Sequence, residues 1–125
     1  MPGVAEAVEA LGATFHVVAV TADTHGTATR LRDALGIEVR VISEGAEADQ
    51  KLALVRELGA EKVVAIGNGA NDVDMVREAA LGIAVIGAEG AAGSLLTVAD
   101  VATTSILDAL SLLSQPARIV ATLRR

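Results

Sequence analysis

Short apolar runs alternate with amphipathic segments along the chain. Three runs are apolar throughout, which is typical of strands buried on both faces of a sheet. A fourth, IEVRVI, alternates apolar with charged residues, which indicates a strand at the edge of a sheet. In chain order, the runs are FHVVAV (15–20), IEVRVI (37–42), KVVAIG (62–67), GIAVIG (82–87) and the weaker ADVATT (99–104).

The segments between these runs have the periodicity of helices, and several end at a glycine, the residue favoured just after a helix. The repeated strand–helix–strand order predicts an α/β fold, a Rossmann-like three-layer sandwich with a mainly parallel sheet. The tail, residues 106–125, predicts a helix, a break at Pro116 and a short second helix. The apolar helix faces are Leu31, Ala34 and Leu35 before Gly36, Leu52, Val55 and Leu58 before Gly59, and Val73, Val76 and Ala80 before Gly82.

Composition supports one domain over residues 1–125. The chain has 125 residues, 52% of them hydrophobic, which suits one sizeable core and excludes a disordered chain. Phe15 is the one aromatic residue, so aliphatic side chains must build that core. There are no cysteines, which excludes disulfides, thiol catalysis and cysteine-ligated metals.

The charge of the chain limits the kinds of partner that it is expected to bind. The net charge is −6, and no basic cluster precedes Arg124 and Arg125, which argues against nucleic-acid binding through a basic face. The first 13 residues, MPGVAEAVEALGA, carry two glutamates and no basic residue, unlike a secretory signal. No apolar run approaches the ~20 residues of a membrane span. We expect a cytoplasmic protein that binds neither nucleic acid nor membrane.

Two polar loops follow predicted strands, where open parallel sheets bind ligands. They are TADTHGT (21–27) and GNGAND (67–72). The second opens a helix, whose free N–H groups attract anions, and its glycines allow close backbone approach. Asp72 adds a carboxylate suited to Mg²⁺, whereas Asp74 is explained by the helix dipole alone.

A dinucleotide-binding turn is an alternative for the same loop. G-x-G follows a strand, and Glu89 lies about 20 residues on, where an acid binding the ribose would lie. However, Asp72 occupies the third glycine position, where its carboxylate would repel a pyrophosphate. Phosphate together with Mg²⁺ is the better interpretation.

These motifs, taken in order, resemble the haloacid dehalogenase-like (HAD) superfamily. GNGANDVDM resembles that family's GDGxND metal loop, and TADT (21–24) resembles the TGDN of P-type ATPase phosphorylation domains. Lys51 stands one helix before the metal loop, as does the family's phosphate-binding lysine. GIAVIGAEG and ADVATTSILDALSLL resemble the later family segments, so the resemblance covers essentially the whole chain. It is nearest to soluble, P-type-ATPase-like hydrolases.

The resemblance implies a Mg²⁺-dependent phosphohydrolase that acts on a small phosphorylated substrate. Thr21 would be the phosphate-binding hydroxyl and Lys51 the phosphate-binding cation, both serving catalysis. Asn71 would be a polar neighbour of the phosphate, while Asn68 and Asp72 would belong to the Mg²⁺ shell. Asn68 stands where the family has an aspartate.

The family's nucleophile is an aspartate in a D-x-x-G-T or D-x-D loop after the first strand. DTHGT, starting at Asp23, fits that pattern. If it were the first motif, however, the phosphate-binding hydroxyl would be expected at the end of the next strand, which is Ser43. IEVRVI would then have to be a central strand, and the gap between Ser43 and Lys51 would be very short. The TGDN-like interpretation is therefore favoured, and Asp23 is not expected to be the nucleophile. His16 and His25 lack metal-ligand spacing and are expected to be structural or exposed.

No D-x-x-G-T or D-x-D precedes FHVVAV, so the family's first strand and its nucleophile are expected to be missing. That strand would lie centrally, and its absence would leave unpaired sheet edges that favour self-association. We expect a core without a cap domain that is inactive alone. The alternatives are a non-catalytic phosphate- or partner-binding module and a nucleotide-binding domain.

Overall fold

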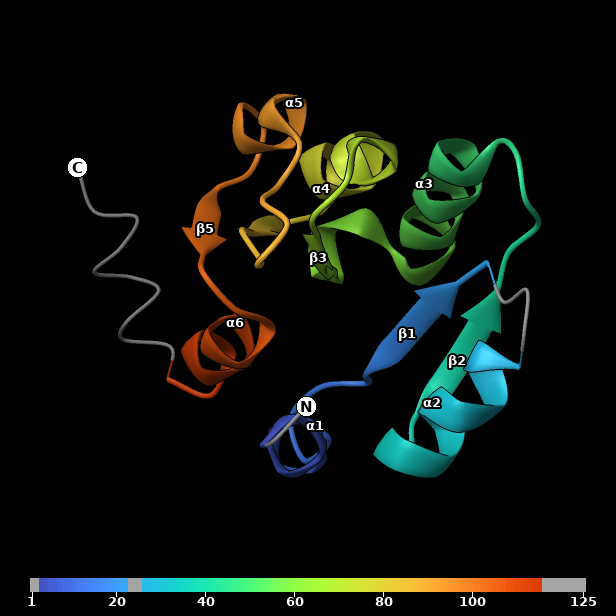
Figure 1. Ribbon diagram of the computed structural model, residues 1–125, viewed down its shortest axis with the longest axis vertical. Helices are drawn as coiled ribbons and strands as arrows, with labels where there is room; N and C mark the ends of the chain where they lie inside the picture. The colour runs from blue at the N-terminus through green and yellow to red at the C-terminus, as the bar shows by residue number, and fades with distance from the viewer. Residues whose placement is uncertain (1–2, 23–25, 116–125) are drawn as a thin grey trace.

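The computed structural model describes residues 3–22 and 26–115, which form alternating strands and helices (Figure 1). A strand overlaps each of the five predicted apolar runs, and the segment before the first run forms a helix. The strands are β1 (Val18–Thr21), β2 (Glu38–Val41), β3 (Val64–Gly67), β4 (Leu81–Val85) and β5 (Val101–Thr103). The helices are α1 (Val4–Leu11), α2 (Thr27–Leu35), α3 (Glu47–Leu58), α4 (Val73–Glu78), α5 (Gly93–Leu96) and α6 (Ile106–Leu113), with short 3₁₀ turns η1 (Ala60–Lys62) and η2 (Ala70–Asp72).

The predicted α/β architecture is confirmed. In Figure 1, α3, α4 and α5 lie along one side of the strands, and α1, α2 and α6 lie along the other. All strand pairs are parallel, as the strand–helix–strand order requires. None of the helices in the described part of the chain is long and apolar enough to cross a membrane. The second tail helix expected after Pro116 lies outside the described residues.

Of the three helices that were predicted to end at a glycine, two do so. Gly36 and Gly59 have φ of 65° and 92°, which side chains rarely adopt, and they follow α2 and α3 directly. The expectation for Gly82 is wrong, because α4 stops at Glu78 and Gly82 lies inside β4. A Cβ on Gly82 would lie 2.4 Å from the carbonyl oxygen of Val76, so glycine there allows α4 to pack closely on the sheet.

The strands form two separate sheets. β1 pairs with β2, and β3, β4 and β5 form the second sheet in that order. β2 therefore lies at an edge, as the alternating IEVRVI pattern predicted. Full burial was expected for three runs, but the buried positions are Gly82, Ile83 and Ala84 in the middle of β4 and Ala65 in β3. β1 is half-buried along its length, because one of its edges has no neighbouring strand.

Two apolar clusters hold the layers together. The first joins α1 and α6 to β4 and β5 around Ile83, and it includes partly buried side chains just before β1 and in β3, such as Val17 and Ile66. The second lies on the opposite face, where α3, α4 and α5 cover β3 and β4 around Leu95 and Val76. Both clusters consist largely of aliphatic side chains, in keeping with the single aromatic residue.

Candidate functional site

The loop after β3 is organised by a buried carboxylate. Asp72 ends η2 and is 5% exposed. Its Oδ2 accepts hydrogen bonds from the backbone N–H groups of Asn68 (3.0 Å) and Gly69 (3.1 Å). Gly67 leaves room for this carboxylate, since a Cβ there would lie 2.5 Å from the Asp72 side chain. The glycine at 67 thus serves the approach of Asp72.

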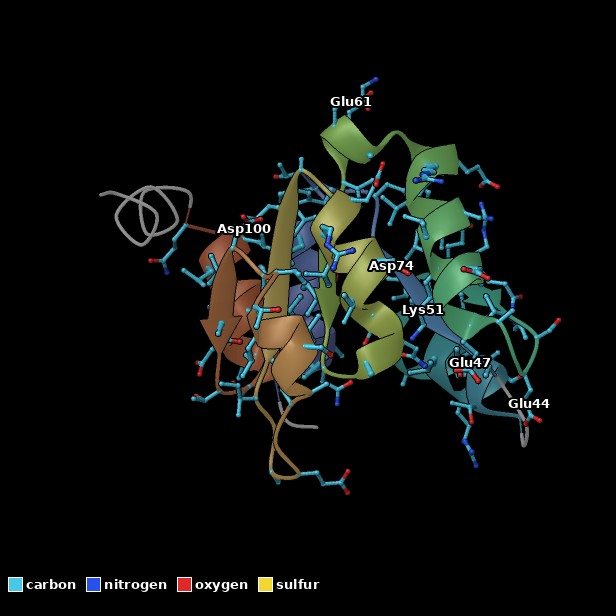
Figure 2. All side chains as sticks on the ribbon, turned by 90° about the horizontal axis from the view of Figure 1, so that it is seen from above. Glu44, Glu47, Lys51, Glu61, Asp74 and Asp100 are labelled. Carbon is cyan, nitrogen blue, oxygen red and sulfur yellow. The ribbon has the colours of Figure 1, made fainter. Side chains whose placement is uncertain are left out.

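Lys51 extends from α3 (Figure 2). Its ammonium donates a hydrogen bond to this carboxylate. Its Nζ lies 2.7 Å from Asp72 Oδ1, and the two side chains are 15% and 8% exposed. A buried ion pair stabilises a protein only when further hydrogen bonds offset the cost of removing both charges from water. Here Asp72 accepts from three donors, so its charge is well compensated.

Asn71 extends the network on the other side of Lys51. Its Oδ1 accepts a hydrogen bond from Lys51 Nζ at 3.0 Å, and its Nδ2 donates to Glu47 Oε2 at 2.9 Å. Glu47 therefore fixes which side of the amide faces the lysine. Sequence reasoning missed Glu47, although it lies four residues before Lys51 and so on the same face of α3.

The start of α3 is fixed by one glutamine. Gln50 Oε1 accepts from the backbone N–H of Ser43 at 2.9 Å, and its Nε2 donates to the carbonyls of Ser43 (2.9 Å) and Gly45 (3.1 Å). This clamp accompanies a positive φ of 48° at Ala46, the residue before the helix. It sets where α3 begins, and so where Lys51 emerges.

The predicted site residues are only partly brought together. Hydrogen bonds join Lys51, Asn71 and Asp72. Asn68 joins them through its backbone, while the residue as a whole is exposed. Thr21 ends β1 in the other sheet. Asp23 and His25 lie outside the described residues.

The residues present do not by themselves make a Mg²⁺ site. Both oxygens of Asp72 already accept hydrogen bonds, one of them from a cation. In the described part of the chain, no group of three histidine, cysteine, aspartate or glutamate side chains could hold a metal ion. Mg²⁺ prefers an octahedron of oxygens and usually takes carboxylates. Asp72 and Asn68 would need at least one further carboxylate.

The geometry also bears on a dinucleotide-binding turn. In such a turn, backbone N–H groups bind a pyrophosphate. The N–H groups of Asn68 and Gly69 bind Asp72 instead, so the carboxylate occupies the place of the phosphate. Asp74 is half-exposed and pairs with Arg77 at 3.3 Å, as expected for an acid at the start of a helix.

A separate ionic cluster lies on β2. His16 Nε2 is 2.8 Å from Glu38 Oε1, Arg40 bonds the other oxygen of Glu38, and Arg40 also pairs with Glu57 at 3.1 Å. The Arg40 guanidinium lowers the pKa of Glu38 through this hydrogen bond and its charge, with a smaller contribution from His16. His16 is thus exposed and paired with a carboxylate, which fits a structural role.

Comparison with known proteins identifies relatives at the level of sequence. A family profile described as haloacid dehalogenase-like hydrolase matches residues 1–80. The uncharacterized protein MJ0073 of Methanocaldococcus jannaschii is 43% identical over 84 residues, which span 64% of this chain and 90% of that protein.

Solved structures share the fold. A 3-deoxy-D-manno-octulosonate 8-phosphate phosphatase from Moraxella catarrhalis, bound to magnesium, phosphate and its sugar, matches 96% of this chain and 75% of its own (TM-score 0.70, 20% identity). A phosphoserine phosphatase matches 90% and 65% (TM-score 0.66, 21% identity). The catalytic domain of the CPx-ATPase CopB-B matches all of this chain and 46% of its own (TM-score 0.67, 19% identity). At these identities the likeness concerns the fold alone.

Proposed function

The chain belongs to the haloacid dehalogenase-like hydrolases, and we propose that it forms the supporting part of a phosphohydrolase site for a small phosphorylated substrate. The observation that carries this proposal is the contact of Lys51 with Asn71 and Asp72, at 3.0 and 2.7 Å. These residues come from segments 20 positions apart, and the family resemblance assigns roles to all three.

In this proposal each group has a defined task. The Lys51 ammonium and the Thr21 hydroxyl hold the phosphoryl oxygens, so that negative charge is stabilised as it moves toward the leaving group. Asn71 orients the ammonium and contributes its amide to the phosphate. Asp72 holds the Lys51 ammonium in place, and the structurally similar M. catarrhalis phosphatase, which is bound to magnesium and phosphate, suggests the class of ligands.

We propose further that the nucleophile is not among the residues of this chain and that Asp23 does not serve as one. The reaction needs a carboxylate oxygen that bonds to phosphorus while the bond to the leaving oxygen breaks. Water then attacks the phosphorus of the acyl phosphate, which releases inorganic phosphate and restores the carboxylate. The same carboxylate would complete a Mg²⁺ shell with Asp72 and Asn68, and Mg²⁺ would neutralise phosphate charge there.

The test compares three proteins in hydrolysis of p-nitrophenyl phosphate with Mg²⁺. The chain alone should show no turnover. A fusion carrying an amino-terminal strand that ends in D-x-x-G-T should be active, and Lys51→Met in that fusion should abolish the activity while the fold, followed by circular dichroism, is kept. Turnover by the chain alone that disappears in Asp23→Asn would make Asp23 the nucleophile and refute the proposal.

A second candidate is a non-catalytic module that binds phosphate or a partner. It is favoured by the mutual neutralisation of Lys51 and Asp72, because both oxygens of the carboxylate are engaged. This candidate predicts that phosphate raises the melting temperature of the fusion, whereas no p-nitrophenyl phosphate is hydrolysed.

A further inference from the structure

The outer edge of β2 is open. In Figure 1, β2 is the outermost strand, on the side of β1 that faces away from the second sheet. Within the described residues, β2 pairs with β1 alone, so its other edge has no neighbouring strand. Val41, at the end of β2, is 52% exposed, more than any other large apolar residue that the structure describes. An open edge with an exposed apolar residue is a place where a further strand can bind.

The hydrogen bonds of β2 show which of its backbone groups face outward. The N–H of Ile42, just after β2, donates to the Thr21 carbonyl of β1 at 2.9 Å. Successive residues of a strand direct their backbone groups to opposite edges, so Val39 and Val41 face away from β1. The Arg32 guanidinium of α2 donates to the Val39 carbonyl at 3.2 Å, which agrees with this direction. Because a carbonyl oxygen has two lone pairs, it can accept a second hydrogen bond there.

The sequence of β2 is complementary to itself. In an antiparallel pair of two copies centred on Val39, Glu38 lies opposite Arg40 and Ile37 lies opposite Val41, while Val39 meets Val39. Every pair then joins two apolar residues or two opposite charges. Centring the pair on Glu38 or on Arg40 instead would place like charges opposite each other, which destabilises a sheet.

This register also fits the backbone and the ion pairs already in place. Val39 and Val41 face outward and would form hydrogen-bonded pairs, whereas Glu38 and Arg40 would fall at the non-hydrogen-bonded pairs, whose side chains lie closest. Within one chain, Arg40 bonds Glu38, and these side chains are 41% and 34% exposed. The second copy would add the same two side chains in reverse order. Four charges would then alternate in sign around a ring.

An open hollow of about 270 Å³ beside this edge leaves room for the incoming side chains. It is lined by residues 40–42 and by one face of α3, which includes Leu54 and Glu57. Arg40 pairs with Glu57 at 3.1 Å, so Arg40 and Glu38 point to the α3 side of the sheet. The second copy's Glu38 would therefore enter this hollow beside Arg40.

We propose that two copies of this chain associate through their β2 strands, antiparallel and centred on Val39. The pairing joins β1 and β2 of both copies into one sheet across a two-fold axis. Alternating charges on an edge strand hinder pairing with most strands, because most registers oppose like charges. Here the same charges favour one partner and one register. The proposal is independent of the proposed function, since neither Lys51 nor Asp72 takes part in the pairing.

Sedimentation of the full chain tests the proposal, with interference optics because the chain has no tryptophan or tyrosine. The parent should change from monomer to dimer as its concentration rises. Glu38→Arg and Arg40→Glu should each weaken the association by about tenfold, because two attractive pairs become repulsive. An equimolar mixture of the two variants should restore it, because each arginine then lies opposite a glutamate. The mixture cannot repair the ion pair within either chain, so only contacts between chains explain such a recovery.

Amide hydrogen exchange gives a second measurement. The N–H groups of Val39 and Val41 should exchange more slowly as the protein concentration rises, whereas the N–H of Arg40, which faces β1, should not change. Val41→Asp is a further variant that should keep the fold, because Val41 is 52% exposed. It should remove the concentration dependence from both measurements, since its charge would lie opposite Ile37.

Three results would overturn the proposal. The first is a parent chain that stays monomeric up to about 1 mM, where even weak specific association is measurable. The second is association of equal strength in both single variants, which would assign it to another surface, such as the inner edges of β1 and β3. The third is a mixture that associates no better than either variant alone, which would exclude this register.

Discussion

Replacing Asp72 by asparagine should destabilise the protein strongly, because three donors converge on this carboxylate. The Lys51 ammonium binds Oδ1, and the N–H groups of Asn68 and Gly69 bind Oδ2. An asparagine has one acceptor oxygen and one donor NH₂ group. In either orientation of the amide, a donor therefore faces a donor.

The magnitude follows from what is left unpaired. Leaving a buried polar group without its partner costs about 1–3 kcal/mol, and breaking one side of a buried ion pair costs ~3–5 kcal/mol. Lys51 is 15% exposed and can partly regain water, so we expect a loss of about 3 kcal/mol. That is a large share of the ~5–15 kcal/mol by which domains are stable.

The assay is urea unfolding followed by far-ultraviolet circular dichroism, since the chain has no tryptophan or tyrosine for fluorescence. With a slope of about 1.5 kcal/mol per molar urea, the midpoint of Asp72→Asn should fall by about 2 M. Asp74→Asn is the matched control. Its carboxylate is half-exposed and, among the residues that the structure describes, pairs only with Arg77 at 3.3 Å, so its replacement should cost less than about 0.5 kcal/mol.

A loss below about 1 kcal/mol for Asp72→Asn would refute the reasoning, because it would mean that water solvates this carboxylate. The double variant with Lys51→Met sharpens the test. If the two side chains interact as the 2.7 Å contact indicates, the double variant should lose less stability than the sum of the single losses.

Three further predictions concern other parts of the fold. Gly67→Ala should cost about 2 kcal/mol in the same urea assay, because its Cβ would lie 2.5 Å from a buried side chain that cannot move away; Gly69→Ala, with nothing closer than 3.5 Å, should cost less than about 1 kcal/mol. Glu38→Gln should lower stability at neutral pH, because the hydrogen bond from Arg40 lowers the pKa of Glu38 and so stabilises the folded state above the ordinary value of 4.5. The difference from the parent should vanish as pH falls through the lowered pKa, and a constant difference in thermal melts from pH 7 to 3 would contradict it. Glu47→Ala should cost about 1 kcal/mol and Glu47→Gln should recover most of that, since the glutamine oxygen can still accept the hydrogen bond seen at 2.9 Å; equal losses in thermal melts would instead assign the effect to charge.

Local patterns predicted most of the elements. Apolar runs bounded by polar loops marked all five strands, and the alternation in IEVRVI correctly placed β2 at an edge. Gly36 and Gly59 marked helix ends, because their positive φ is a local requirement. Gly82 was misassigned as a helix end because the requirement for glycine there is not local. Glycine is needed where Val76 of α4 packs against the strand, and no pattern within one segment encodes that contact.

In the candidate site, too, some features could be predicted from the sequence and others could not. The loop chemistry singled out Asp72, and the resemblance to the family, through the order of its motifs, singled out Lys51 and Asn71. Their pairing was not readable, because a lysine on a helix surface looks the same whether it meets water or a buried carboxylate. Glu47 and Gln50 carried no motif at all. The packing of α3 against η2 gives Glu47 its partner Asn71, and Gln50 bonds to the loop just before α3.

The sequence by itself determined which segments are strands and helices, the parallel α/β arrangement and the family. These properties follow from periodicity, from turn residues and from short motifs, all of which act over a few neighbouring residues. Only the tertiary structure decided that the strands fall into two sheets and that the Asp72 carboxylate binds Lys51 and two backbone N–H groups. Pairing between distant strands and the burial of a charge depend on which surfaces meet, and that is settled when the whole chain packs.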